Sequence, residues 1–212
     1  MKSILVAIFA LFYNQSFGQN ISTPKGYESL AEKKGDLNND GIDEKVIVYN
    51  TADTTEDGTV RELRIFKLIK GDWELWKKSR NAIKKSQEGG MMGDPFESID
   101  IAKGLLIILF SGGSSWKWNY TDKYRFQNGE FQLIGYSGIY GKLCEYWVDV
   151  DFNLITGKVI YKKEFEDCDK NQQVYKRQNE VFIKKGISLN IGNRNSKELK
   201  IISPKYKHEF YL

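Results

Sequence analysis

Hydrophobic and polar residues alternate in short runs along most of this chain. Runs of this kind, bounded by glycine, asparagine and aspartate, are typical of strands that bury one face. Compact turns join three pairs of runs, at Lys70-Gly71-Asp72, at Ala102-Lys103-Gly104 and at Asn128-Gly129. The pattern predicts about ten to twelve strands. They are carried by residues 45–49, 61–69, 73–77, 96–101, 105–110, 116–126, 131–136, 144–152, 158–168, 173–183 and 199–202.

Regularly spaced short strands without a long helical stripe predict an all-β fold, mostly antiparallel. A sandwich, a barrel and a partial propeller-like sheet all fit this spacing. Residues 105–110 (LLIILF) are continuously apolar, which predicts a strand buried on both faces. Residues 20–34 form a polar lead-in, residues 50–59 a polar turn and residues 81–95 an irregular segment.

The N-terminus has the pattern of a secretory signal peptide. A basic start is followed by the apolar run at residues 4–13 and by the small residues of Ser16-Phe17-Gly18. We therefore expect residues 1–18 to be a signal peptide cleaved near Gly18-Gln19, and the protein to be periplasmic or secreted. A buried N-terminal strand or helix is the alternative. Residues 19–212 are expected to form a single β-rich domain, and no later run reaches the ~18 apolar residues of a membrane span.

Charge argues against a nucleic-acid partner. The 212 residues carry a formal net charge of +4, and the lysines are dispersed along the chain. A dispersed, mild excess indicates a solvated surface rather than a polyanion groove.

The two cysteines are predicted to form a disulfide. Cys144 and Cys168 flank two alternating runs that turn at residues 154–157. A hairpin closing there pairs residues whose numbers sum to about 311 or 312, so the two cysteines face one another. Export makes the disulfide the default state. A redox or nucleophilic thiol is the alternative, but there is no CxxC motif.

A possible metal loop lies at residues 36–44, with the sequence DLNNDGIDE. Asp36, Asn38 and Asp40 alternate, Gly41 permits a sharp turn, the Ile42 carbonyl adds a ligand and Glu44 closes the set. These hard oxygen ligands select calcium over zinc or copper. An asparagine- and aspartate-rich turn without metal is the alternative.

This loop resembles the calcium loop of FG-GAP/VCBS-type repeats. An EF-hand is excluded because Ile47 stands where its bidentate glutamate would be. In FG-GAP/VCBS repeats a D-x-N-x-D-G motif runs directly into a strand, and the acid at position 9 closes the site. The resemblance implies a structural calcium ion in an exported protein. That family usually carries aspartate where Glu44 stands, and it has several copies of the loop, whereas this chain has one.

A second resemblance covers more of the chain and implies only location. Its motifs are the acidic loop at 36–44, then GDPF at 93–96, GGSSWKW at 112–118, FQNGEFQLIGY at 126–136 and NLITGK at 153–158. In this order they resemble a group of small exported bacterial proteins of unknown role.

Two further groups of residues suggest ligand sites. Trp116, Trp118 and Tyr120 alternate, so they share one strand face and could form a stacking platform for sugars; a place in the core is the alternative. Acidic residues could supply the paired carboxylates of a glycosidase, although exposed positions explain them as simply. These acids are Asp94, Glu97, Asp100, Asp149 and Asp151.

Catalytic motifs are otherwise missing from the sequence. The single histidine, His208, lies in the C-terminal tail, and there is no GxSxG, GxxxxGK[ST] or GxGxxG motif. The sequence therefore predicts a non-catalytic, calcium-stabilised binding or interaction module of the bacterial cell envelope, with a protein or a glycan as its partner. An envelope glycan hydrolase and a periplasmic inhibitor or immunity protein are the alternatives.

Overall fold

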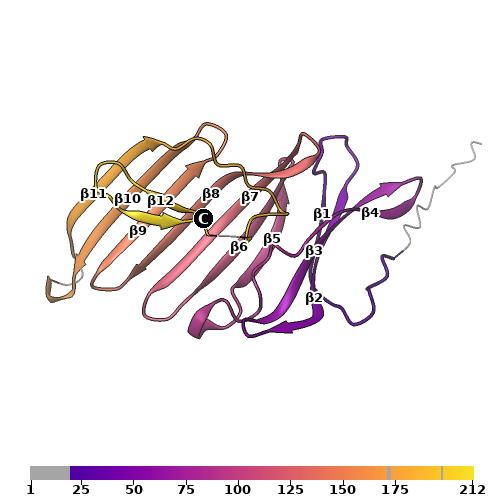
Figure 1. Ribbon diagram of the computed structural model, residues 1–212, viewed down its shortest axis with the longest axis horizontal. Helices are drawn as coiled ribbons and strands as arrows, with labels where there is room; N and C mark the ends of the chain where they lie inside the picture. The colour runs from indigo at the N-terminus through magenta and orange to yellow at the C-terminus, as the bar shows by residue number, and fades with distance from the viewer. Residues whose placement is uncertain (1–19, 171–172, 197) are drawn as a thin grey trace, which may run out of the picture.

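The computed structural model describes residues 20–170, 173–196 and 198–212 and confirms a mostly antiparallel all-β fold (Figure 1). These described residues contain thirteen strands, slightly more than the ten to twelve predicted. The strands are β1 (Glu28–Gly35), β2 (Glu44–Thr55), β3 (Gly58–Ile69), β4 (Asp72–Ser79), β5 (Phe96–Ala102), β6 (Leu105–Gly113), β7 (Lys117–Gln127), β8 (Glu130–Lys142), β9 (Tyr146–Asn153), β10 (Lys158–Asp167), β11 (Gln173–Ile183), β12 (Lys200–Ile202) and β13 (Glu209–Tyr211). Two short 3-10 helices, Gly90–Met92 and Cys168–Lys170, complete the assignment.

The strands form two meanders and one small hairpin. β1 to β4 make a four-stranded sheet, β5 to β11 a seven-stranded sheet, and β12 pairs with β13. Every strand in the two larger sheets pairs with its neighbour in sequence, and both sheets remain open in the part of the chain that the structure describes. Of the three arrangements that the sequence left open, the barrel is therefore not formed.

Glycine-containing turns set the hairpins as predicted. Lys70-Gly71, Lys103-Gly104 and Asn128-Gly129 all have positive φ at both residues. This geometry matches the twist of antiparallel strands, and glycine adopts it without strain. The three predicted hairpins are confirmed.

Two polar segments were assigned wrongly from the sequence. The lead-in at residues 20–34 contains most of β1, and the polar turn at 50–59 is the continuation of β2 and β3, with only Glu56 and Asp57 between them. Neither strand has an apolar alternation in these stretches. They form because backbone hydrogen bonding to an adjacent strand overrides weak side-chain preference.

The strand buried on both faces is also not the predicted one. In β6, Leu106 and Ile108 are buried, but Leu109 is 36% exposed, so LLIILF buries one face only. Residues 46–49 of β2 (VIVY) are buried on both faces instead. Val46 and Val48 face the main core, whereas Ile47 and Tyr49 face the other way and pack with Phe66 and Tyr27.

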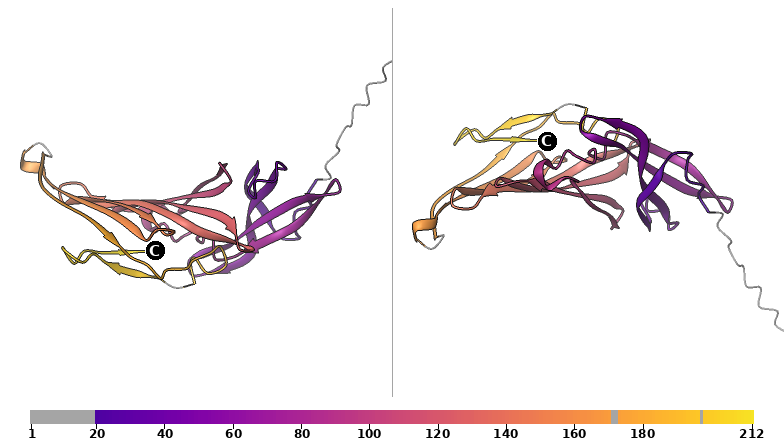
Figure 2. Two further views of the ribbon diagram at one scale, coloured as in Figure 1. Left: turned by 90° about the horizontal axis from the view of Figure 1, so that it is seen from above. Right: turned by 90° about the horizontal axis from the view of Figure 1, so that it is seen from below.

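The C-terminal segment, residues 184–212, covers one face of the seven-stranded sheet. Both views of Figure 2 place the β12–β13 hairpin on the same side of that sheet. Backbone hydrogen bonds tie the segment to the start of β8, from Leu133 N to Leu189 O (2.8 Å) and from Ile191 N to Phe131 O (3.1 Å). The apolar side chains that the segment adds to the core are Leu189, Ile191, Ile201, Phe210 and Leu212.

The two large sheets meet along β1 and β5. An ion pair joins Lys33 to Asp100 (3.3 Å), and Gly35 lies so close to Ile101 that a Cβ on the glycine would be 2.7 Å from the Ile101 side chain. The 36–44 loop begins directly after Gly35, so it sits at the junction of the sheets.

The predicted disulfide is confirmed. Cys144 and Cys168 are bonded, with their Cα atoms 5.0 Å apart. They lie just beyond the paired parts of β9 and β10, whose register matches the predicted sum, as in Asn153 opposite Lys158. The bond staples the open end of this hairpin.

Residues 1–18, the expected signal peptide, lie outside the described residues. In the part that is described, no helix is long and apolar enough to cross a membrane.

Removing the disulfide is predicted to lower the free energy of unfolding by about 3 kcal/mol. The bond closes a loop with a sequence separation of 24, and it limits the conformations of the unfolded chain. Urea unfolding of the oxidised wild type and of a C144A/C168A variant measures the effect, and the wild type under reducing conditions should unfold like the variant. Equal urea midpoints for the variant and the oxidised wild type would contradict this role.

Candidate functional site: an aromatic cavity under the C-terminal segment

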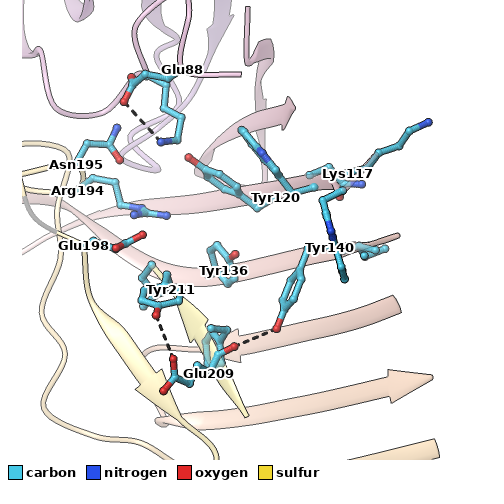
Figure 3. Close-up of a pocket in the computed structure, with 18 residues that line it drawn as sticks. Glu88, Lys117, Tyr120, Tyr136, Tyr140, Arg194, Asn195, Glu198, Glu209 and Tyr211 are labelled. Carbon is cyan, nitrogen blue, oxygen red and sulfur yellow. Dashed lines mark hydrogen bonds and ion pairs between the residues drawn. The ribbon is translucent and has the colours of Figure 1, made fainter. Parts of the chain in front are cut away.

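The candidate site is a cavity of about 600 Å³ between the seven-stranded sheet and the C-terminal segment (Figure 3). β7 and β8 supply its aromatic wall, and the C-terminal segment and the 81–95 segment supply polar groups. The residues discussed below are Lys84, Glu88, Trp116, Trp118, Tyr120, Tyr136, Tyr140, Arg194, Asn195, Glu209 and Tyr211.

Alternation along β7 and β8 builds the aromatic wall. The rings of Trp118 and Tyr120 are stacked, with centroids 5.7 Å apart and planes at 22°, and Tyr136 lies 5.6 Å beyond Tyr120. Tyr140 stands opposite Trp118 in the strand register. Gly138 makes room for this packing, because a Cβ there would lie 2.7 Å from the Tyr136 hydroxyl.

A buried ion pair lies at the base of this wall. Arg194 donates to the two oxygens of Asp122 through Nε (2.7 Å) and Nη2 (3.2 Å), and both side chains are almost fully buried. The Tyr124 hydroxyl donates to Asp122 as well (3.1 Å). The guanidinium also lies 5.5 Å from the Tyr120 centroid, within cation–π range. Burial opposes the charged form of Arg194, but the Asp122 carboxylate prevails and raises the pKa of the guanidinium.

The tyrosines of the cavity are neutral hydrogen-bonding groups. Burial raises the pKa of Tyr120 and of Tyr136, and the Asp122 charge adds to the effect. Burial also raises the pKa of Tyr140, whose hydroxyl donates to the Glu209 carbonyl (3.1 Å). Tyr120 and Tyr136 can therefore donate to a ligand, and none of the three phenols supplies a base near neutral pH.

Asn195 presents an unused hydrogen-bond donor. Its Nδ2 atom is buried and has no hydrogen-bond partner in the described part of the chain. An unpaired buried amide is unfavourable, since it has lost water without gaining a partner. Because Asn195 lines the cavity, a rotation of its side chain toward an acceptor on a bound molecule would remove this cost.

Charged groups of both signs surround the aromatic wall. Glu88 lies 3.8 Å from Lys84, and Glu209 accepts from the Tyr211 hydroxyl (3.2 Å) and pairs with Lys200. Hydrogen bonding from Lys200 lowers the pKa of Glu209. The rim is thus zwitterionic rather than strongly charged.

The three predicted platform residues all line the cavity, but they are not equivalent. Trp118 and Tyr120 share a face of β7, whereas Trp116 precedes the strand, is 41% exposed and lies 5.0 Å from Tyr146. Trp118 also packs so closely on Gly112 that a Cβ there would be 2.4 Å from its ring. Trp118 is therefore a wall of the cavity, and Trp116 is an accessible ring at its mouth.

The proposed metal ligands lie together in the 36–44 loop. Asp36 accepts backbone N–H bonds from Asn39 (2.6 Å) and Gly41 (2.9 Å), which curl the loop around its carboxylate. Asn38 Nδ2 donates to both Asp40 (2.8 Å) and Glu44 (2.9 Å). Ile42 is half exposed, and its N–H donates to Asp40 (2.8 Å).

The protonation of this loop is compatible with a cation. Burial raises the pKa of Glu44, the charges of Asp40 and Asp36 add to this, and the Leu37 N–H opposes it. The N–H of Gly41 lowers the pKa of Asp36. The Asn38 amide thus bridges the carboxylates of Asp40 and Glu44. Among the described residues, however, no three acidic, histidine or cysteine side chains lie close enough together to hold a metal ion. The oxygen-bearing side chains of the loop are of the type that calcium takes as ligands.

The acids considered for glycosidase chemistry are engaged elsewhere. Asp94 binds Arg61 through both oxygens, and Glu97 accepts from the Ser111 hydroxyl. Asp149 pairs with Lys162 (3.6 Å), and Asp100 with Lys33. Asp151 is exposed on the strand face opposite the cavity.

His208 is likewise used structurally. Its Nε2 lies 2.7 Å from Gln178 Oε1, and its ring stacks on Tyr161 with centroids 5.3 Å apart. Burial lowers its pKa.

Sequence reasoning missed most of the polar part of the cavity. Arg194 and Asn195 lie in a loop without a motif, and their position depends on the return of the chain across the sheet. Tyr136 and Tyr140 had a signal, since they alternate on β8, which pairs with the predicted platform strand.

Breaking the Asp122–Arg194 pair is predicted to destabilise the protein by about 3–5 kcal/mol, because either partner alone would be a buried unpaired charge. We expect this loss for Asp122→Ala and for Arg194→Met. The double variant Asp122→Leu/Arg194→Met should lose less than the sum of the two. Urea unfolding measures all three, and strict additivity would refute the coupling.

Comparisons with known proteins add no family assignment. No protein-family model matches the chain, and no curated protein matches it.

Proposed function

We propose that this chain is an exported, non-catalytic binding module of the bacterial cell envelope that holds a saccharide in the aromatic cavity. The observation that carries this proposal is the combination of the Trp118–Tyr120–Tyr136 wall with the unused Asn195 donor. Apolar faces of sugar rings pack on aromatic side chains, while sugar hydroxyls need both donors and acceptors.

The mixed charges of the rim support a hydroxyl-rich ligand. Glu88 and Glu209 offer acceptors, and Lys84 and Asn195 offer donors, within the same cavity. A cavity of about 600 Å³ falls in the range typical of small-molecule sites.

The alternative of a glycan hydrolase has less support. A glycosidase needs a carboxylic acid whose pKa is raised, so that it can protonate the leaving group. Glu209 has its pKa lowered instead. If the protein were a hydrolase, the binding experiment below would also release shorter products, which chromatography of the incubated sugars would detect.

The 36–44 loop is proposed to bind a structural calcium ion. Asp36, Asn38, Asp40, Glu44 and the Ile42 carbonyl would hold it, and the ion would replace the proton or amide contacts that now offset the buried charge of Glu44. Since Leu37 is buried in the core and the loop lies at the junction of β1 and β5, calcium would stabilise the junction of the two sheets.

Saccharide binding is predicted to depend on the cavity. We expect cello-, chito- or malto-oligosaccharides to change tryptophan fluorescence in a saturable way, and Asn195→Ala and Tyr211→Ala to weaken the binding by ~10-fold. Leu75→Ala is the matched control, because this exposed side chain of β4 lies outside the cavity. Equal effects of all three substitutions, or no saturable response to any of the sugars, would exclude the cavity as the site.

Calcium is predicted to raise the melting temperature and to release protons on binding. Protons compete with calcium for Glu44, whose pKa is raised above the ordinary 4.5, so the affinity should fall as the pH drops through the window just above that value. Calorimetry in buffers of different ionisation enthalpy measures the release. Asp36→Ala/Asp40→Ala should abolish the response, and Asp43→Asn, an exposed neighbour paired with Lys34, should retain it. A response that survives the double substitution would refute these ligands.

A further inference from the structure

A row of four aromatic rings extends from the cavity across the seven-stranded sheet. Trp116, Tyr146, Phe165 and Tyr175 follow one another with centroids 5.0, 6.0 and 6.2 Å apart. We name this row the aromatic ladder. It lies at the end of the sheet closed by the disulfide, and Trp116 belongs both to the ladder and to the cavity mouth.

The ladder is accessible to a ligand. Trp116 is 41% exposed and Tyr175 60% exposed, while Tyr146 and Phe165 are half-buried between them. An exposed, continuous row of large rings is uncommon on a protein surface and marks an interaction site.

Two lysines lie over the ladder without a counter-ion. Lys163 Nζ is 3.5 Å from the Tyr146 centroid and 4.9 Å from that of Phe165, and Lys176 Nζ is also 4.9 Å from Phe165. Among the described residues, no carboxylate lies within ion-pair distance of either lysine. The cations next to them in sequence do have counter-ions, because Lys162 pairs with Asp149 (3.6 Å) and Arg177 pairs with Glu164 (2.7 Å).

The two unpaired charges act on each other. Burial lowers the pKa of Lys163, and the positive charge of Lys176 lowers it further. Cation–π contacts with the rings offset part of the cost of holding two positive charges close together at a half-buried position. An anion between the two ammonium groups would offset the rest of that cost.

We propose that the aromatic ladder binds a linear acidic polysaccharide whose carboxylates draw Lys163 and Lys176 off the ring faces, so that its sugar rings stack on Trp116, Tyr146 and Phe165. This inference rests on the proposed saccharide function and extends it from the cavity to a polymer. Successive rings of the ladder are 5.0, 6.0 and 6.2 Å apart, which is comparable to the length of one pyranose unit. One end of the polymer would then reach the cavity through Trp116.

The charge of the ladder favours a carboxylated sugar chain over a nucleic acid. Among the side chains that the structure describes, only two unpaired cations lie over the rings, and Lys142, whose Nζ is 5.8 Å from the Trp116 centroid, is already 3.3 Å from Glu145. A phosphate on every unit would need more neutralising groups than this. A polymer with widely spaced carboxylates matches the two sites.

The test compares oligogalacturonate, a neutral cello-oligosaccharide and single-stranded DNA by calorimetry. We expect the wild type to bind oligogalacturonate more tightly than the neutral sugar. We also expect K163Q/K176Q to weaken the acidic ligand by ~10-fold with little effect on the neutral one. K162Q/K184Q is the control, since it removes two charges outside the ladder. F165A should weaken both sugars, and thermal melts verify that each variant is folded.

The outcomes separate this inference from the proposed function. Three outcomes would overturn the ladder as an acidic-glycan site. They are equal weakening by K162Q/K184Q, tighter binding of DNA than of oligogalacturonate, and equal affinity for acidic and neutral sugars. Equal affinity for both sugars would leave the proposal of saccharide binding in the cavity intact. Failure of both sugars to bind would overturn both proposals.

Discussion

The Asp122–Arg194 ion pair links the C-terminal segment to the centre of the seven-stranded sheet. Arg194 lies in a segment without regular pairing, whereas Asp122 lies in the middle of β7. Burying two charges costs solvation free energy, which their mutual attraction offsets only when the two groups meet in good geometry. The two hydrogen bonds from Arg194 to Asp122 provide this geometry. The pair therefore specifies where the segment crosses the sheet, and the walls of the cavity follow from that crossing.

The cavity exists because this coverage is incomplete. Leu189, Ile191 and Phe210 bury the apolar face of the sheet on either side, but between them the chain presents Arg194 and Asn195 to the tyrosines of β7 and β8. A polar segment facing aromatic rings cannot close into a tightly packed core without leaving donors unpaired, as Asn195 shows. The same arrangement that weakens the core thus makes a site suited to a polar ligand with an apolar face.

Local patterns in the sequence account for much of this fold. The X-Gly turns define three hairpins because only residues that tolerate positive φ fit there, and the Cys144–Cys168 register follows from counting residues around a turn. Edge and extension strands were missed, since β1 and the far half of β2 carry mostly polar residues without apolar alternation, and backbone pairing with the adjacent strand holds them in place. The two-sided burial of residues 46–49 was missed for a different reason. It depends on Ile21 and Tyr27, which cover that face from a segment with no strand pattern of its own.

The order of the strands has a consequence for the folding pathway. Because each strand of the seven-stranded sheet pairs with its sequence neighbour, the sheet can form hairpin by hairpin from contacts of short sequence separation, which favours rapid assembly. Its apolar face, however, is covered by the last residues of the chain. During synthesis, the nascent sheet would present Phe131, Val150 and Phe152 to solvent until the C-terminal segment arrived. The vulnerable species for aggregation is therefore the nearly complete chain, at the stage when a chaperone would have most effect.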